Sequence, residues 1–441
     1  MGIGWGWGRS ILPLLNPYCF TTTYLLRYSC TKYRWFKLMN GWQRLQQSTF
    51  AKVGALILVV LYLGATFAEG IAPYDPYSSQ TDGALLPPTQ IYWQTRDGQF
   101  IGPHVYPTIQ GAIDMTTGDR ALIVDWTKPS PIGLFVSGSA YRLFQIRIPF
   151  PHWRSPTLPL VNPPLNQPVN QPDPPTSPTA SSPWEWDEVE IIPGIPSTIH
   201  LMGTVGEAKW NLLGTDEQAR DQLSRLIYGS RISLGIGLIG IMITFPLGMV
   251  IGGISGYFGG WLDAGLMRFV EVLMTIPGIY LLVALAAVLP SGLSSTQRFL
   301  LIVFITSFVN WAGLARVIRG QVLSIKEREF VQAAQGMGGS PVYIIIRHVL
   351  PQTMTYVIIS ATLTIPSFIV AESVLSLIGL GIQQPDPSWG NLLSLATNAS
   401  ILVLQPWLVW PPALLIIVTV LSFNLLGDGL RDALDPRTLE Q

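Results

Sequence analysis

Long apolar runs dominate the pattern of the chain and alternate with polar stretches. A helix that crosses the hydrocarbon core of a bilayer needs about 20 apolar residues, and it tolerates proline where neighbouring helices satisfy the freed backbone groups. Six runs reach that length, at residues 53–72, 232–257, 269–289, 299–318, 355–380 and 407–426. The pattern predicts an all-α polytopic membrane protein with six transmembrane helices.

The composition agrees with a membrane protein and argues against several functions. Hydrophobic residues make up 49% of the chain and charged residues 12%, against roughly 25% charged residues in soluble domains. Because 26 basic residues balance 26 acidic ones, nothing indicates a nucleic-acid partner. Cys19 and Cys30 alone cannot build a disulfide framework or a metal site, and the four histidines are too scattered for a metal cluster.

The short loops predict the orientation. Lys and Arg accumulate in the short cytoplasmic loops of membrane proteins, whereas long loops cross largely regardless of charge. Basic residues lie before the first run, between the fourth and fifth runs and after the sixth: Arg27, Lys32, Arg34, Lys37, Arg44, Lys52, Arg316, Arg319, Lys326, Arg328, Arg347, Arg431 and Arg437. We therefore expect both termini and residues 316–351 in the cytoplasm, and residues 73–211 outside.

Residues 1–52 form the predicted cytoplasmic N-terminal segment. Residues 1–38 contain no clean apolar core and no small-residue cleavage site, so they do not read as a signal peptide. One hypothesis is that translation begins at Met39.

The external insert, residues 73–211, has two parts of different character. Residues 91–101 predict a β-hairpin around the turn Asp97-Gly98, and residues 121–126 predict a further strand. Residues 149–183 contain twelve prolines among polar residues, a composition that cannot bury a core and predicts disorder. The tract is interpreted as a linker, with a PxxP ligand as the alternative.

The chain re-enters the membrane through a patterned segment. Thr215 or Asp216 can cap a helix predicted over residues 217–228. Three arginines lie in this segment: Arg220, Arg225 and Arg231. The segment is interpreted as an interfacial amphipathic elbow with snorkelling arginines, and ligand contact is the alternative.

A polar hairpin of short helices, residues 330–351, lies between the fourth and fifth runs. Its first helix places Phe330, Ala333, Ala334 and Met337 on one face, and Gly338-Gly339 ends it. Ser340 is a natural cap for the next helix with Pro341 at its first position, and Leu350-Pro351 is expected to end that helix. An exposed ridge of Ala333 and Ala334, with Gly338 at its tip, would let a partner approach closely. The alternative is an amphipathic hairpin packed on its own bundle.

The hairpin resembles the EAA loop of ABC-importer permeases, the coupling segment that inserts into the ATPase subunit. The matching pattern is Gln332-Ala-Ala-x3-Gly338-x9-His348-x-Leu350-Pro351, with Gln332 where the family has Glu. His348 stands where a hydrophobic residue is usual, although Arg-His before Leu-Pro is common in the peptide branch. Five other segments resemble the C-type subunit of dipeptide/oligopeptide importers, with Ala219 where Gly is usual: residues 71–76, 213–234, 256–261, 387–390 and 423–436.

The resemblance implies a MetI-like, ABC type I importer permease core over residues 212–436, with five transmembrane helices and a coupling loop at 326–351. It implies that the residues which couple to the ATPase are Gln332, Ala333, Ala334, Gly338, Leu350 and Pro351. The implied partners are a second permease subunit in a heterodimer, cytoplasmic ATPase subunits and an extracytoplasmic substrate-binding protein. The implied location is the bacterial cytoplasmic (inner) membrane, and the implied cargo is a dipeptide or oligopeptide.

The chain is not predicted to be an enzyme and needs no cofactor. It contains no Gly-x4-Gly-Lys-Ser/Thr, the phosphate-cradling loop that ATP binding requires, so ATP hydrolysis is expected in a partner. No trustworthy catalytic constellation occurs either. Two other classes stay open. A secondary transporter would need interrupted helices in repeated halves; a membrane-anchored sensor or assembly subunit would use the external insert as its functional part.

Charged residues inside predicted spans are candidate functional groups. Glu372, in the fifth span, is a candidate for lining the translocation path, and pairing with a partner subunit is the equal alternative. Glu271 and Asp263, near the inner ends of spans, are expected to pair locally with Arg268.

Overall fold

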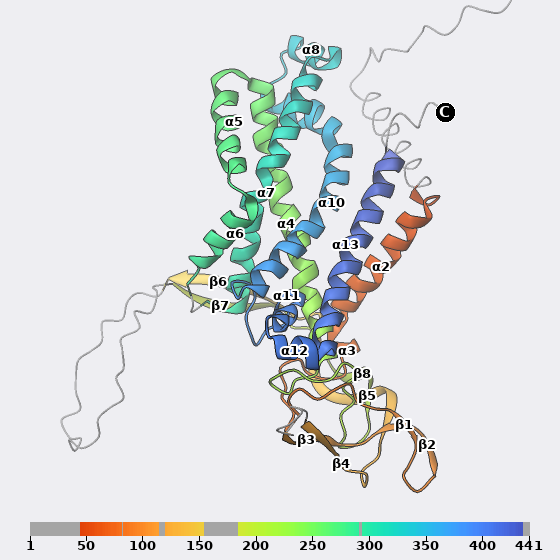
Figure 1. The fold of residues 1–441 in the computed structure, drawn as a ribbon. Helices are drawn as coiled ribbons and strands as arrows, with labels where there is room; N and C mark the ends of the chain where they lie inside the picture. Colours follow the sequence, from red (N-terminus) through yellow and green to blue (C-terminus); the bar gives the residue numbers. More distant parts are fainter. Residues whose placement is uncertain (1–44, 82, 114–119, 154–183, 291–292, 435–441) are drawn as a thin grey trace, which may run out of the picture.

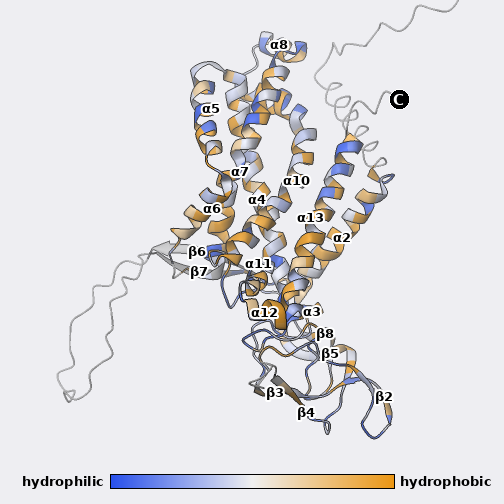
Figure 2. Cartoon of the chain, viewed as in Figure 1, coloured by the Kyte–Doolittle hydropathy of each residue, from blue (hydrophilic) through white to orange (hydrophobic). Residues whose placement is uncertain are grey.

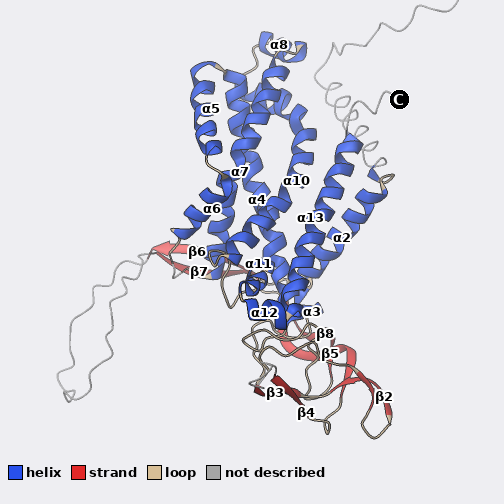
Figure 3. Cartoon of the chain, viewed as in Figure 1, coloured by secondary structure: helices blue, strands red, loops and turns tan. Residues whose placement is uncertain are grey.

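The computed structural model describes residues 45–81, 83–113, 120–153, 184–290 and 293–434. Long helices run side by side, the strands gather at one end of them, and helix α8 lies at the opposite end (Figures 1 and 3). The hypothesis about Met39 and most of the proline-rich tract fall outside the described residues.

The helices confirm the predicted polytopic architecture. Among the described residues, five helical segments are long and apolar enough to cross a membrane, and a bent helix pair makes a sixth if it forms one span. Hydrophobic residues predominate along the middle of these helices (Figure 2). The five segments are α2 (Thr49–Thr66), α4 (Gln222–Phe258), α7 (Ser295–Lys326), the run Pro341–Leu377 that ends in α10 (Leu350–Leu377), and α13 (Pro406–Leu434).

The third predicted span does not form one straight helix. It is divided into α5 (Gly260–Thr275) and α6 (Gly278–Ala287), which are bent by 83°. The break falls at Ile276, which is extended (φ −81°, ψ 124°), and at Pro277, which precedes α6. A residue before proline is sterically pushed out of the helical region, so this break has a local cause.

The most extensive contact between the long helices is the glycine-lined seam of α4 and α7. A Cβ at Gly252 would lie 2.5 Å from the Ala315 carbonyl oxygen, and one at Gly256 would lie 2.8 Å from the Arg319 carbonyl oxygen. Ser307 Oγ also donates a hydrogen bond of 3.2 Å to the Gly240 carbonyl across the seam. Small residues that bring backbones together and hydrogen bonds between helices are the means by which membrane helices associate.

Helix α2 is fixed to the rest of the bundle at both of its sides. It packs against α13, where a Cβ at Gly54 would lie 2.6 Å from the Ser422 carbonyl oxygen. Arg231 of α4 ion-pairs with Glu69, in the short helix α3 (Ala68–Ile71), and its guanidinium also donates to the last carbonyls of α2. A cation at the carboxyl end of a helix stabilises it. Arg231 therefore forms an ion pair within the protein instead of snorkelling as predicted.

The external insert contains the predicted hairpin and the predicted strand. Strands β1 (Tyr92–Gln94), β2 (Phe100–Val105), β5 (Ser130–Leu143) and β8 (Ile195–Thr204) form one antiparallel sheet in that order. Two further pairs are β3 (Thr108–Ile113) with β4 (Arg120–Val124), and β6 (Ile146–Trp153) with β7 (Trp184–Ile192). Disorder is thus wrong for residues 149–153, which lie in β6.

Two shorter helices close the end of the bundle that carries the strands. They are α11 (Trp389–Leu393) and α12 (Ala399–Leu404), joined by a 3-10 turn over Ser394–Thr397. Trp389 is fully buried, and its indole N–H donates to the Leu226 carbonyl of α4 at 3.1 Å. This hydrogen bond ties the loop after α10 to the beginning of α4.

We predict that Gly252→Ala weakens the seam, whereas Gly253→Ala does not. The new Cβ at 252 would collide with backbone of α7, at a cost of about 1–3 kcal/mol typical of overpacking. At 253 the Cβ would make ordinary contacts with the side chains of Leu350, at 3.4 Å, and Ile345, at 3.7 Å. Thermal unfolding of the two variants in detergent measures the difference, and equal midpoints would contradict close backbone approach at Gly252.

Candidate functional site

The candidate coupling site is the hairpin that begins with α8 (Glu329–Gly336), at the end of the molecule opposite the strands (Figure 1). Val331 and Ala334 are buried in an apolar cluster with Val322, Ile344 and Val349. The buried face of α8 therefore rests on the end of α7 and on the second helical part of the same hairpin.

The expected exposed ridge of Ala333 and Ala334 is wrong for Ala334. Ala334 is only 5% exposed, whereas Ala333 is exposed beside it. Helical geometry places Gln332, Ala333 and Gly336 opposite the buried pair Val331 and Ala334. The outward face of α8 thus carries two small residues and one amide, with the exposed Glu329 on the same side in the first turn. Gly336 was missed, although it lies one helical turn after Ala333.

The turn after α8 matches its prediction. Gly338 is exposed and has φ +81°, a left-handed conformation that glycine adopts at least cost. Ser340 Oγ accepts a hydrogen bond from the Tyr343 N–H at 3.4 Å, and Pro341 begins the next helix, α9 (Pro341–Ile344). The predicted cap and helix start are confirmed.

The expected end of that helix at Leu350-Pro351 is wrong. A π-helical turn over Ile345–Val349 joins α9 to α10, so the helical run continues to Leu377. The Leu350 N–H bonds to the Ile345 carbonyl, five residues earlier. Proline cannot donate and crowds the preceding turn, and a π turn is one way for a helix to absorb this.

Gln332 makes a hydrogen bond that the family's glutamate could not make when ionised. Its side-chain amide donates to the Glu327 carbonyl oxygen, just after α7, at 3.2 Å. An ionised carboxylate only accepts hydrogen bonds. On the flank of α8, Gln335 Nε2 contacts the Tyr257 hydroxyl at 3.1 Å. Both amides hold α8 to its own bundle.

The charged residues near the inner ends of the spans pair differently from expectation. Glu271 pairs with Arg268 at 3.0 Å, as predicted. Asp263 pairs instead with Arg319 of α7 and accepts a hydrogen bond from Ser255 of α4. The prediction was wrong for Asp263 because its partner lies on a helix that is distant in sequence. This pair attaches α5 to the α4–α7 seam.

Glu372 lies fully buried within the chain. One carboxylate oxygen, Oε1, accepts hydrogen bonds of 2.7 Å from Ser376 and from Ser388, and Ser388 caps α11. The other oxygen has no hydrogen-bond partner among the described residues. Glu372 therefore connects α10 to the loop that precedes α11. A role in the translocation path stays a prediction.

Comparison with known proteins shows the family to which the chain belongs. Residues 248–440 match the family described as "Binding-protein-dependent transport system inner membrane component", and residues 38–88 match the "N-terminal TM domain of oligopeptide transport permease C". The chain is 41% identical over 228 residues to the oligopeptide transport system permease protein OppC of Haemophilus influenzae, covering 52% of this chain and 71% of the relative. The chain belongs to this family of peptide-transport permeases.

Two further likenesses accompany these matches. The dipeptide transport system permease protein DppC of Bacillus subtilis is 42% identical over 224 residues, which cover 51% of this chain and 68% of that protein. Among solved structures, inward-facing conformations of the MetNI methionine ABC transporter match with a TM-score of 0.37 and 18% identity, covering 48% of this chain and 97% of that chain. The family assignment rests on the sequence matches.

The permease carries a second polar cluster where the chain enters α4. Asp216 accepts from Arg220 Nε at 2.8 Å and pairs with Arg225 Nε at 3.3 Å. Both guanidinium groups also donate to Gln384 Oε1, at 2.7 and 2.8 Å. The predicted elbow is therefore wrong: α4 begins only at Gln222, and Arg220 and Arg225 are buried structural partners.

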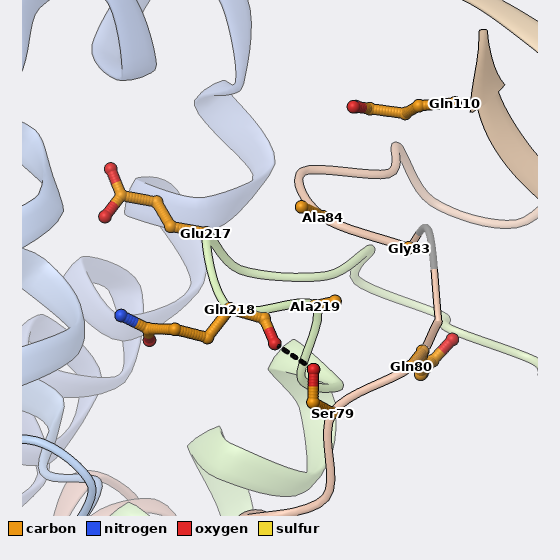
Figure 4. Close-up of a pocket in the computed structure, with 8 residues that line it drawn as sticks. All are labelled: Ser79, Gln80, Gly83, Ala84, Gln110, Glu217, Gln218 and Ala219. Carbon is orange, nitrogen blue, oxygen red and sulfur yellow. Dashed lines mark hydrogen bonds between the residues drawn. The ribbon is translucent and has the colours of Figure 1, made fainter.

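A hollow of about 400 Å³ opens beside this turn (Figure 4). Ser79 Oγ donates to the Gln218 carbonyl at 2.6 Å, and Figure 4 shows the side chains of Glu217 and Gln218 pointing away from Gln80. The hollow does not bring charged groups together. Its full lining is Ser79, Gln80, Gly83, Ala84, Gln110, Glu217, Gln218 and Ala219.

Ala219 holds a conformation that suits the glycine usual at this place. Its φ is +59°, in the left-handed region. A residue with a Cβ costs roughly 1–2 kcal/mol more there than glycine. The neighbouring hydrogen bonds offset this strain, since the Ala219 carbonyl accepts from the Gln80 N–H at 2.9 Å and its own N–H donates to Asp216.

Asp221 is the cap of α4 and a fully buried acid. Its Oδ2 accepts from the N–H and the hydroxyl of Ser224, both at 2.7 Å. Oδ1 is buried with no hydrogen-bond partner in the described part of the chain. Burial raises the pKa of Asp221 from 3.8 to about 6, against the lowering effect of the Ser224 hydrogen bonds.

We predict that Asp221→Asn stabilises the permease above pH 6 and not at pH 4. Because the folded pKa exceeds the unfolded one, the folded state holds the extra proton between pH 4 and 6, so wild-type stability falls as pH rises through that window. Asparagine is an equally good cap without the buried charge, and the gain at pH 7.5 should be about 1–3 kcal/mol.

Unfolding by denaturant at pH 4 and pH 7.5 measures this difference. Asp221→Ala is the matched control, because it removes the buried charge as Asp221→Asn does but also removes the cap, so it should be less stable than Asp221→Asn at both pH values. A gain for Asp221→Asn that is the same at both pH values would contradict a buried, titrating carboxylate.

Proposed function

We propose that this permease is one of two membrane subunits of an ATP-driven importer that moves peptides across the bacterial cytoplasmic membrane. The observation that carries the proposal is the outward face of α8, formed by Gln332, Ala333 and Gly336. Small side chains there let a partner's groove approach the helix backbone. The family to which the chain belongs supports the same reading, because the named relatives carry oligopeptides and dipeptides.

In this proposal α8 docks on a separate cytoplasmic ATPase subunit. The hairpin is attached to the α4–α7 seam through buried Val331 and Ala334, so a movement of the docked ATPase displaces the helices with it. Rigid-body rocking of this kind would switch the substrate path between outward- and inward-facing states. Both termini and the hairpin are cytoplasmic, and the strands face the binding protein that delivers the peptide.

The coupling residues divide into two roles. Gln332, Ala333 and Gly338 are exposed and would contact the ATPase. Ala334 is buried, and Leu350 and Pro351 are half-buried in the helical run, so these three would hold the hairpin in place. We propose that Glu372 lines the translocation path only in a conformation in which the contact between α10 and Ser388 is broken.

Ala333→Glu should abolish ATP-coupled peptide uptake and the co-purification of the ATPase. A charged, longer side chain on the outward face prevents close approach and is left unpaired in the contact. We expect at least a tenfold loss of association, which corresponds to about 1.4 kcal/mol. Uptake of labelled peptide into vesicles, together with pull-down of the ATPase, measures both effects.

Gln335→Glu is the matched control, since it adds the same charge on the flank of α8, where the carboxylate can accept from Tyr257. Wild-type uptake by this variant is expected. Ala334→Glu is unsuitable, because it would place a charge in the buried cluster and unfold the hairpin. Full uptake by Ala333→Glu would contradict docking through this face.

A further inference from the structure

One side of α2 presents an apolar stripe to the surroundings of the bundle. Its members recur at helical spacing and are all exposed: Val53, Leu56, Val60, Leu63 and Phe67. Since α2 is a membrane-spanning helix, this stripe faces lipid. Phe67 is its outermost member, at the point where α2 ends.

Strand β5 runs alongside the residues that follow α2. Three contacts show which residues of the two segments lie side by side. The rings of Phe67 and Phe144 meet edge to face at 5.4 Å. Further out, the Tyr141 hydroxyl lies 3.2 Å from the position of a Cβ on Gly70. Beyond that, the ring of His200 bridges the carbonyls of Ala72 and Ser139, at 2.6 and 3.0 Å. Strand β5 therefore approaches the membrane with Phe144 at the level where α2 leaves it.

An exposed apolar cluster continues from Phe144 across the neighbouring turn. Ile192 and Ile195 are exposed, and Ile195 pairs with Leu143 at the end of the β5–β8 strand pair. We call Phe67, Phe144, Ile192 and Ile195 the interfacial patch. Contiguous apolar surface on a protein marks a contact with a partner or a membrane.

Polar groups border the interfacial patch. The exposed Arg142 pairs with Glu190 at 3.3 Å, and Gln145 donates to the same carboxylate at 2.8 Å. A long arginine side chain beside apolar residues suits the boundary between acyl chains and headgroups, where its charge reaches water. Aromatic residues such as Phe67 and Phe144 can extend into the apolar side of that boundary.

We infer that the interfacial patch inserts into the outer leaflet of the bilayer and anchors the external insert on the membrane surface. Its continuity with the lipid-facing stripe of α2 identifies lipid, rather than another protein, as the occupant. Burial of exposed apolar side chains at the acyl boundary supplies the driving force. The strand pair β6–β7, which follows directly from the patch, is then held close to the membrane. This inference requires neither the ATPase nor a particular cargo.

Spin labels report depth at chosen positions. Cys19 and Cys30 are replaced by serine, and single labels are attached to Ile195→Cys, to Leu63→Cys on the lipid-facing stripe and to Leu134→Cys. Leu134 is as exposed as any apolar residue of the insert, at 71%, and lies ten positions before Phe144 along β5, toward the end that pairs with β2. The full chain is reconstituted into vesicles of phosphatidylethanolamine and phosphatidylglycerol.

We expect the Ile195 label to resemble the Leu63 label, with relaxation enhanced by oxygen and protected from a water-soluble nickel complex. The Leu134 label should show the reverse, with a several-fold lower ratio of oxygen to nickel accessibility. If the Ile195 label is as accessible to nickel as the Leu134 label, the patch faces water and the inference fails. Protection from both reagents would mean that protein covers the patch, and that result would also overturn the inference. Ile192→Cys provides a second position if the first variant does not fold.

Discussion

The close approach of α4 and α7 is the constraint on which the rest of the permease depends. Glycines of α4 leave no room for a side chain between the two backbones, and hydrogen bonds from Ser307 and Thr244 cross the same contact. Helix α7 ends at Lys326, immediately before the coupling hairpin, whose buried face packs on the same helix. The position of α8 is therefore set by the seam. A partner that moves α8 moves a packed body rather than a loop.

The end of the molecule that carries the strands is held together by polar contacts. Buried polar contacts replace apolar packing there. They are the ion pairs of Arg231 with Glu69 and of Arg220 and Arg225 with Asp216, and the contacts of the bridging His200. Buried charges cost desolvation free energy, so they stabilise only when every partner is in place. Such contacts specify geometry: they fix where the insert, α2 and the loop before α11 meet.

Sequence analysis predicted what depends on local pattern. The apolar spans, the β-hairpin at Asp97-Gly98 and the cap at Ser340 follow from hydrophobic length and turn chemistry, and the structure confirms them. Contacts between distant segments could not be predicted in this way. Helical spacing described the faces of α8, but only the packing of Ile344 and Val349 decides that Ala334 lies inside. Likewise, Asp263 pairs with Arg319, and Asp216 with Arg225 beside Gln384, because the fold brings these segments together.

The proposed function places the ATPase contact on the outward face of α8. The most direct measurement is alkylation of Ala333→Cys, with Cys19 and Cys30 replaced by serine, by a membrane-impermeant maleimide in inside-out vesicles, with and without the ATPase subunits. The account predicts rapid labelling in their absence and protection when they are bound. Equal labelling in the two preparations, or no labelling in either, would contradict it.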